Sequence, residues 1–282
     1  IVLVPPVPGS PLAPSVAPGL GVVGIMTPYT PLHHLLLEAA GRPLVMTSGN
    51  LSEEPIATGN AEARERLGRV ADAFLLHDRD IVARYDDSVV RLLDGAPVLI
   101  RRARGYAPIP VPLPFPSPRP LLAVGPHLKN TFALVHGESA FVSQHIGDLE
   151  NLETLEHFRA SLERFRTLFR VDPEVVVRDL HPGYLSTRLA EELSREWSLG
   201  PPMGVQHHHA HVAAVMAEHG VDEPVVGVAY DGTGYGEDGT IWGGEFFEVD
   251  GEEVTRAGHL SRFPLPGGDA ARPRAPGRHD AG

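Results

Sequence analysis

The sequence has no cysteine in its 282 residues, which excludes disulfides, cysteine-ligated zinc fingers and a thiol nucleophile within it. No apolar run approaches the roughly 20 residues of a membrane span, and the start has no signal-peptide pattern. Positive charge is scarce, since 24 Lys and Arg accompany 36 Asp and Glu, a net charge of −12. Without a basic surplus, general nucleic-acid binding is not expected. A cytoplasmic location is expected.

Proline spacing divides the chain into two regions. Every second residue from Pro108 to Pro120 is proline, which predicts a stiff, extended connector without the donors for a sheet ladder. We therefore expect a first domain over residues 1–107, a linker over 108–120 and a second domain over 121–266. Residues 267–282 are rich in Gly, Pro and Arg and predict a disordered tail. This tail and the start at Ile1 indicate an incomplete chain.

Short apolar strands alternate with helical periodicity in both regions, which predicts an α/β fold. Expected helices are 31–40, 61–71 with Asn60 as N-cap, 152–169, 185–197 and 207–219. Expected strands are 21–26, 43–47, 74–77, 88–93, 97–101, 121–124, 131–135, 139–143, 174–178, 225–230 and 240–249. Gly137 is expected in a hairpin turn between 131–135 and 139–143. The order in the second region suggests half of an actin-like, ribonuclease-H-type fold.

Four histidines fall within five positions in the stretch VQHHHAH, residues 205–211. His207 and His211 are four residues apart, share one helical face and are predicted to hold one divalent metal ion. His208 and His209 then remain for catalytic contacts. Imidazole accepts both iron and zinc, so the sequence does not choose between them. A polar helix start with solvated imidazoles is the competing interpretation.

Two motifs of the first region suit anion binding. Thr47, Ser48 and Asn50 follow an expected strand, where open α/β sheets place ligands. An ordinary Ser-Gly-Asn turn explains this motif equally well. A cluster of three arginines also follows a strand, and planar guanidinium groups suit a polyphosphate or acyl-phosphate. A solvated edge balanced by Asp86 and Asp87 is the alternative. The cluster consists of Arg101, Arg102 and Arg104.

Two motifs of the second region are further ligand candidates. Asp231 follows an expected strand and is a candidate to hold a metal or its water, and a glycine-rich turn succeeds it. That turn leaves backbone amides accessible to an anion, although hairpin glycines explain it too. Its glycines are Gly232, Gly234 and Gly236. Residues 125–131 lie where actin-like folds grip phosphate, with a surface turn as the alternative. The candidate contacts there are Lys129, Asn130 and Thr131.

Two further segments place His and Asp just after expected strands. We expect these four side chains to line the same cleft as the histidine helix. They are His145, Asp148, Asp179 and His181.

Ordered motifs extend over residues 1–269. In the first region they are PYTPLHH (28–34), MTSGNLSEEPI (46–56), DDSVV (86–90) and RRARGYAP (101–108). In the second they are LKNTF (128–132), SQHIGDLE (143–150), DLHP (179–182), VQHHHAH (205–211) and WGGE (242–245). Together they resemble the HypF family of hydrogenase-maturation carbamoyltransferases.

The resemblance implies a partial YrdC-like domain followed by part of an actin-like, threonylcarbamoyl-enzyme-like domain. The first would form carbamoyl-adenylate from carbamoyl phosphate and ATP with Mg²⁺. The second would pass the carbamoyl group to the C-terminal cysteine of a partner, HypE. By position, Ser48, Asn50 and the arginine cluster belong to the adenylate site. His207 and His211 belong to the metal site, with a further aspartate ligand expected beyond Gly282.

Several alternatives to this enzyme remain at the sequence level. The family's N-terminal domain, its cysteine zinc fingers and the latter half of its second domain are absent. The chain could thus be an inactive fragment or a module that docks the acceptor protein. Transfer of threonylcarbamoyl groups to tRNA uses both domain types as well. A sugar-kinase-like actin fold leaves the histidine helix unexplained.

Overall fold

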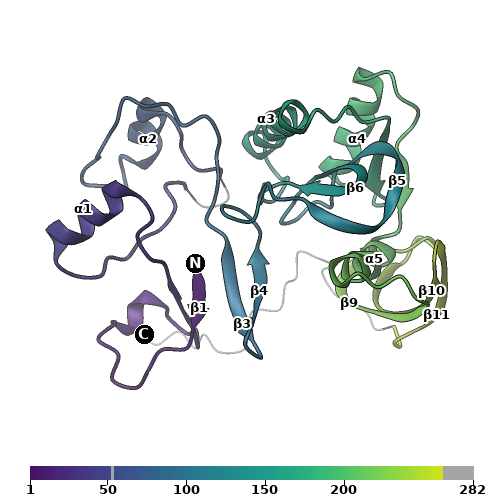
Figure 1. The fold of residues 1–282 in the computed structure, drawn as a ribbon, viewed down its shortest axis with the longest axis horizontal. Helices are drawn as coiled ribbons and strands as arrows, with labels where there is room; N and C mark the ends of the chain where they lie inside the picture. Colours follow the sequence, from purple (N-terminus) through teal and green to yellow (C-terminus); the bar gives the residue numbers. More distant parts are fainter. Residues whose placement is uncertain (52–53, 263–282) are drawn as a thin grey trace. The chain divides into compact units, whose positions relative to one another are not determined.

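A computed structural model describes residues 1–51 and 54–262 of the chain (Figure 1). They form two compact units. Unit 1 contains residues 1–178 and 183–203, and unit 2 contains residues 179–182 and those described from 204 onward. The predicted disordered tail over 267–282 lies outside the described residues. In the described part, no helix combines the length and apolar character needed to cross a bilayer.

The first part of unit 1 is built on a four-stranded sheet with the order β2-β1-β3-β4. β1 pairs antiparallel with β2 and parallel with β3, and β3 and β4 form a hairpin. The predicted helix over 31–40 is confirmed as α1, and its N-terminus is capped by the Thr30 hydroxyl, which accepts from His33 N–H. A second helix, α2, and a short 3-10 turn at Pro14–Val16 complete this part. The bounds are β1 Val2–Val4, β2 Val23–Ile25, β3 Val89–Leu93, β4 Ala96–Arg101, α1 Pro31–Ala40 and α2 Asn60–Leu67.

Three predictions for this part are wrong. Residues 43–47 and 74–77 form no strand; Val45 is 77% exposed and Leu75 is 74% exposed, so neither segment has the buried face that its apolar pattern implied. The N-cap of α2 is Gly59 rather than Asn60. The Glu62 carboxylate accepts hydrogen bonds from Gly59 N–H and Thr58 N–H. The N-terminus of α2 is therefore capped by a side chain from its own first turn.

The second part of unit 1 carries its hydrophobic core. Its sheet has the order β6-β5-β7-β8, and the boundary between the units falls at the ends of β7 and β8. Helix α3 contributes Phe158, Leu162 and Phe165 to the core, and helix α4 contributes Leu189 and Leu193. These helices confirm the periodicity expected from the sequence. The bounds are β5 Val111–Ala123, β6 Ala133–Val142, β7 Val175–Asp179, β8 Met203–Val205, α3 Leu152–Phe169 and α4 Leu185–Glu196.

The prediction of an unpaired, stiff connector over 108–120 is wrong, because most of this segment belongs to a strand. Residues 111–120 form the first part of β5 and pair with β6, Val111 opposite Ala140 and Ser117 opposite Gly137. The prolines have no N–H to donate, and the pairing is irregular: its register shifts between Pro112 and Ser117 and again between Ser117 and Leu121. β7 pairs with β5 only through residues 121–123.

The hairpin expected around Gly137 is also wrong. Residues 133–142 form the single strand β6, and the antiparallel partner of this strand is β5. Gly137 has a φ of 58° and lies where the pairing register of β5 shifts. The glycine therefore marks a bulge within a strand rather than a turn between two strands.

Unit 2 consists of helix α5 beside a three-stranded antiparallel sheet of order β11-β10-β9. The predicted helix over 207–219 is confirmed, with the Gln206 side chain as its cap and Gly220 left-handed at its end. Val212 packs with Ala229, Trp242 and Phe247 in a small core. β8 and β11 were not predicted. The bounds are α5 His207–His219, β9 Val225–Tyr235, β10 Ile241–Asp250 and β11 Glu253–His259.

Replacing Ser88 tests the packing of the segment that follows β4. Its hydroxyl accepts from Ala103 N–H at 2.8 Å and donates to the Arg104 carbonyl at 2.9 Å, and Ser88 is 5% exposed. Ser88→Ala leaves a buried donor unpaired and should lower the free energy of unfolding by about 1–3 kcal/mol. Ser117→Ala, whose hydroxyl bonds the Arg119 carbonyl at the surface, should change it by less than about 0.5 kcal/mol. Urea denaturation measures both; equal effects would contradict this account.

Candidate functional site

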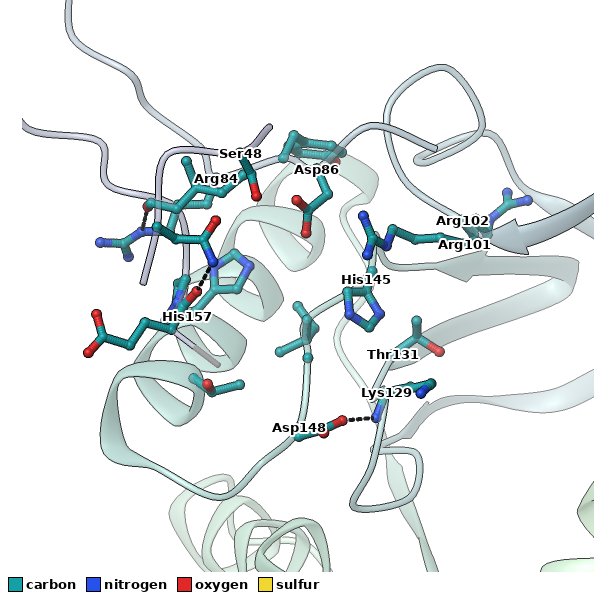
Figure 2. Close-up of a pocket in the computed structure, with 18 of the residues that line it drawn as sticks. Ser48, Arg84, Asp86, Arg101, Arg102, Lys129, Thr131, His145, Asp148 and His157 are labelled. Carbon is teal, nitrogen blue, oxygen red and sulfur yellow. Dashed lines mark hydrogen bonds between the residues drawn. The ribbon is translucent and has the colours of Figure 1, made fainter. Parts of the chain in front are cut away.

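Unit 1 contains a cavity of about 590 Å³ (Figure 2). Ser48 and Asn50 line it from the segment after α1, and Lys129 and Thr131 line it from the loop between β5 and β6. Arg101 and Arg102 lie at the end of β4 and also line it. The structure thus brings together residues that the sequence analysis assigned to two separate anion sites.

Main-chain hydrogen bonds fix the arginine segment beside this cavity. The Arg102 carbonyl accepts from His145 N–H at 2.9 Å, and the Ser88 hydroxyl bonds the next two residues. The Arg102 guanidinium donates to the carbonyls of Tyr106 and Ile109 at 3.0 and 2.6 Å. Burial lowers the pKa of Arg102, which nevertheless stays a cation at neutral pH. Arg102 therefore braces its loop, and Arg101 has no such bond among the described residues.

The loop between β5 and β6 presents Lys129 and Thr131 while Asn130 holds the loop in place. Asn130 is fully buried, and its amide donates to the carbonyls of Val124 and Pro126. Lys129 has a φ of 47°, and its N–H donates to Asp148 Oδ1 at 2.5 Å. Asn130, which the sequence analysis listed as a ligand contact, is instead a brace for its neighbours.

Two other predicted contacts do not line the cavity. Thr47 is not among the lining residues. Arg104 lies over the Tyr29 ring at 5.6 Å and has its Nε 3.4 Å from Asp87 Oδ1. Arg104 therefore fits the alternative interpretation of the arginine cluster, in which acidic side chains balance a cation at the surface.

The cavity also includes lining residues that sequence reasoning missed. Arg84 donates to the Ile56 carbonyl at 2.8 Å, and Glu54 and His157 also contribute to the wall. His157 is 5% exposed, and burial with the nearby Arg84 and Arg164 lowers its pKa to about 4, so it is neutral. An isolated Arg or a helical His carries no motif that would have revealed them.

In unit 2, three candidate metal ligands converge at the start of α5. His207 Nε2 lies 3.2 Å from His211 Nε2 and 3.1 Å from Asp231 Oδ2, and the last two atoms are 3.8 Å apart. All three lie within 4.8 Å of one another. Zn–N bonds of about 2.0–2.1 Å place tetrahedral ligand atoms about 3.3 Å apart. The donor set therefore fits a divalent ion.

Neighbouring residues orient these candidate ligands and shift their pKa values. His207 Nδ1 lies 2.6 Å from Asp179 Oδ2, so the carboxylate orients the ring and directs Nε2 to the site. Asp179, followed by Asp231, raises the pKa of His207 to about 9 in the metal-free chain. Proximity to His207 and the Gly232 N–H lower the pKa of Asp231 against the opposing effect of burial. Asp231 is thus a third candidate ligand among the described residues, in addition to the one expected beyond Gly282.

His208 and His209 occupy different surroundings from the ligand pair. His208 is fully buried, and the Gln206 amide donates to its Nδ1 at 3.2 Å, which leaves the proton on Nε2. Nε2 is 3.8 Å from Asp231 Oδ2, so His208 is a donor facing the site. Burial lowers its pKa and keeps it neutral. His209 packs edge-on against Phe247 at 4.9 Å, and burial lowers its pKa too.

The glycine-rich turn predicted after Asp231 begins later than expected, because β9 continues to Tyr235. A Cβ on Gly234 would lie 2.3 Å from His208 Cε1, and one on Gly236 would lie 2.1 Å from Trp242 Nε1. Close packing against these rings explains both glycines without a phosphate. Gly232 has open space around its Cα.

The four His and Asp residues expected in one cleft fall into two groups. His145 and Asp148 line the cavity of unit 1. Asp179 bonds His207 in unit 2, and His181 stacks edge-on with Tyr235 at 5.5 Å.

Comparison with protein families covers nearly the whole chain. Residues 1–103 match the Telomere recombination (Sua5/YciO/YrdC) family. Residues 116–218 match the HypF Kae1-like domain, and residues 227–279 match the second subdomain of the carbamoyltransferase Kae1-like domain. The chain belongs to the HypF carbamoyltransferase family.

Individual relatives agree with this assignment to the HypF family. Carbamoyltransferase HypF2 of Cupriavidus necator is 52% identical over 91% of this chain and 34% of its own length. Carbamoyltransferase HypF of Synechocystis is 49% identical over 92% of this chain and 33% of its own. A crystal structure of full-length HypF in a phosphate- and nucleotide-bound form matches with a TM-score of 0.88 and 52% identity. It covers 95% of this chain and 35% of that one.

The HypF relatives confirm the fold class, a YrdC-like part followed by an actin-like part. The chain spans about a third of the length of these relatives.

A pair of glycine variants tests whether packing explains the glycines of β9. Gly234→Ala forces a methyl group against the buried His208 ring and should lower the free energy of unfolding by about 1–3 kcal/mol. Gly232→Ala, in the same strand, meets no atom within 4 Å and should be neutral or slightly stabilising. Thermal and urea unfolding measure both. If Gly234→Ala leaves the free energy of unfolding unchanged, the packing explanation is wrong.

Proposed function

We propose that this chain supplies the nucleotide cavity and the metal site of a HypF-type carbamoyltransferase acting in the cytoplasm. The observation that carries the proposal is the convergence of cations and uncharged polar groups on the cavity of unit 1. Arg84, Arg101 and Lys129 line it with Ser48 and Asn50. Such a set suits the phosphates of ATP and carbamoyl phosphate.

The proposed reaction in the cavity forms carbamoyl-adenylate. Water first hydrolyses carbamoyl phosphate, which releases inorganic phosphate and leaves carbamate. A carbamate oxygen then bonds to the α-phosphorus of ATP as the bond to the β-phosphate breaks and pyrophosphate leaves. The arginine and lysine side chains stabilise the charge that shifts onto the leaving group. Asp86 and Asp148 also line the cavity, and their carboxylates supply oxygen ligands for the Mg²⁺ that accompanies ATP.

The proposed metal site of unit 2 serves the transfer of the carbamoyl group. His207, His211 and Asp231 would hold iron or zinc, which when bound supplies a Lewis acid for phosphate or carbonyl oxygens. His208 Nε2–H is held behind the ligands, 3.8 Å from Asp231 Oδ2, where it supports the position of that carboxylate. Asp179 keeps His207 in the orientation that binding requires.

The proposed acceptor is the C-terminal cysteine of a partner protein, HypE. The chain itself has no cysteine, so the attacking thiolate must come from outside it. The family's role in hydrogenase maturation supports this partner.

Exchange of labelled pyrophosphate into ATP in the presence of carbamoyl phosphate tests the cavity. Arg101→Ala should reduce the exchange by about 10- to 100-fold, because a charge-assisted hydrogen bond to phosphate is lost. Arg91→Ala is the matched control, since Arg91 is an exposed cation on β3 outside the cavity. Identical exchange rates in both variants would show that Arg101 does not contribute to nucleotide binding in this cavity.

Metal analysis after dialysis tests unit 2. One divalent ion per chain is expected, and His207→Ala or Asp231→Ala should abolish binding. Asp179→Asn should weaken it by about 10- to 100-fold through loss of ring orientation. His219→Ala, at the exposed end of the same helix, is the control and should bind normally.

The pH dependence of metal binding supplies a second readout. Because the pKa of His207 is raised to about 9, the ring is protonated at neutral pH and the ion must displace a proton. Affinity should rise with pH and level off above about 9. Calorimetry in buffers of different ionisation enthalpy should show proton release that disappears at higher pH. Binding independent of pH between 7 and 9 would argue against His207 as a ligand.

A further inference from the structure

His145 lines the cavity of unit 1 without a function assigned to it above. Figure 2 shows its imidazole between Arg101 and Thr131, facing the cavity space. Its neighbours Gln144 and Ile146 are buried, at 1% and 6% exposure, and both belong to the interior. Within residues 1–51 and 54–262, no hydrogen bond or ion pair engages the imidazole of His145. The ring is therefore a polar group in a cavity with unused donor and acceptor capacity.

The backbone around this histidine is firmly held. His145 N–H donates to the Arg102 carbonyl at 2.9 Å, and Ile146 N–H donates to the Asn130 carbonyl at 2.9 Å. The side chain of Gln144 donates to the buried Ser161 hydroxyl at 2.9 Å. The ring is thus presented from a rigid segment, which lowers the entropy cost of any contact that it makes with a ligand.

The charges around His145 favour an anionic ligand and a neutral ring. Burial, followed by the neighbouring Arg101, lowers its pKa, and Lys129 acts in the same direction; Asp86 and Asp148 oppose them. The neutral His157 lies nearby on α3. At neutral pH the ring therefore carries one N–H donor, and it can meet a phosphoryl oxygen without adding another charge.

We propose that His145 donates a hydrogen bond to a phosphoryl oxygen of the nucleotide in this cavity. The inference rests on the proposed function, because it takes ATP as the ligand. It assigns to a residue of the HypF Kae1-like region, 116–218, a direct part in a site whose arginines belong to the YrdC-like region, 1–103. Nucleotide binding then requires both regions at once.

Affinity for Mg·ATP, measured by calorimetry on the 282-residue chain, tests the proposal. His145→Leu should raise Kd about tenfold or more, the cost of losing one hydrogen bond to a charged group. His145→Gln keeps an N–H donor and should bind within about threefold of the original chain. His136→Leu, at an exposed position on β6, is the control and should not change Kd. Circular dichroism and melting establish that each variant is folded.

Histidine ring signals in ¹⁵N-labelled chain give a readout that does not depend on the stability of His145→Leu. The signal missing from His145→Gln identifies the ring, and it should shift on addition of Mg·ATP.

The outcomes separate this inference from the proposed function. If Arg101→Ala weakens ATP binding while His145→Leu binds normally and the ring signal stays fixed, the role of His145 is overturned and the nucleotide cavity stands. If Mg·ATP does not bind the original chain, or binds Arg101→Ala equally well, the proposed function fails. Equal losses in the Leu and Gln variants would exclude the hydrogen bond.

Discussion

The geometry of the cavity depends on the main-chain hydrogen bonds of residues 101–104. Ser88 binds Ala103 N–H and the Arg104 carbonyl, and the Arg102 carbonyl accepts from His145 N–H. Ala103 is fully buried between them. The bond between Arg102 and His145 joins the YrdC-like region to the segment that follows β6 in the Kae1-like region. Without this bond, His145 would have no defined place beside the cavity, because it lies on a connecting segment, whereas Arg101 is the last residue of β4 and pairs with Val89.

A second constraint operates at α5, where carboxylates determine what each imidazole can do. Asp179 contacts Nδ1 of His207 and Asp231 lies beside its Nε2, so the pKa of this ring is raised to about 9. His208, one residue later, is buried with a Gln206 amide on Nδ1, and its pKa is lowered. The adjacent His207 and His208 thus differ in charge because of their contacts, not because of their order in the chain.

Local patterns predicted the helices well, since the bounds of α1, α3 and α5 match the ranges expected from periodicity. They failed where the outcome depended on distant partners. Residues 43–47 have strand composition, yet Val45 is exposed and the segment has no ladder. Gly137 resembles a turn residue, but its partner strand comes from before Gly125. For the sites, sequence spacing identified His207 with His211, whereas the juxtaposition of Ser48 with Lys129 follows from tertiary packing. Arg84 and His157 carry no motif at all.

The alternating prolines of β5 have a consequence for association between copies of the chain. Along residues 111–120, β5 pairs with β6, and five of the ten residues are prolines, which have no N–H. An incoming strand would find no N–H donor at any of these prolines, so it could not complete a ladder. A segment rich in extended backbone is thereby prevented from templating intermolecular sheets, and the residue type that first suggested a stiff connector acts as a barrier to aggregation.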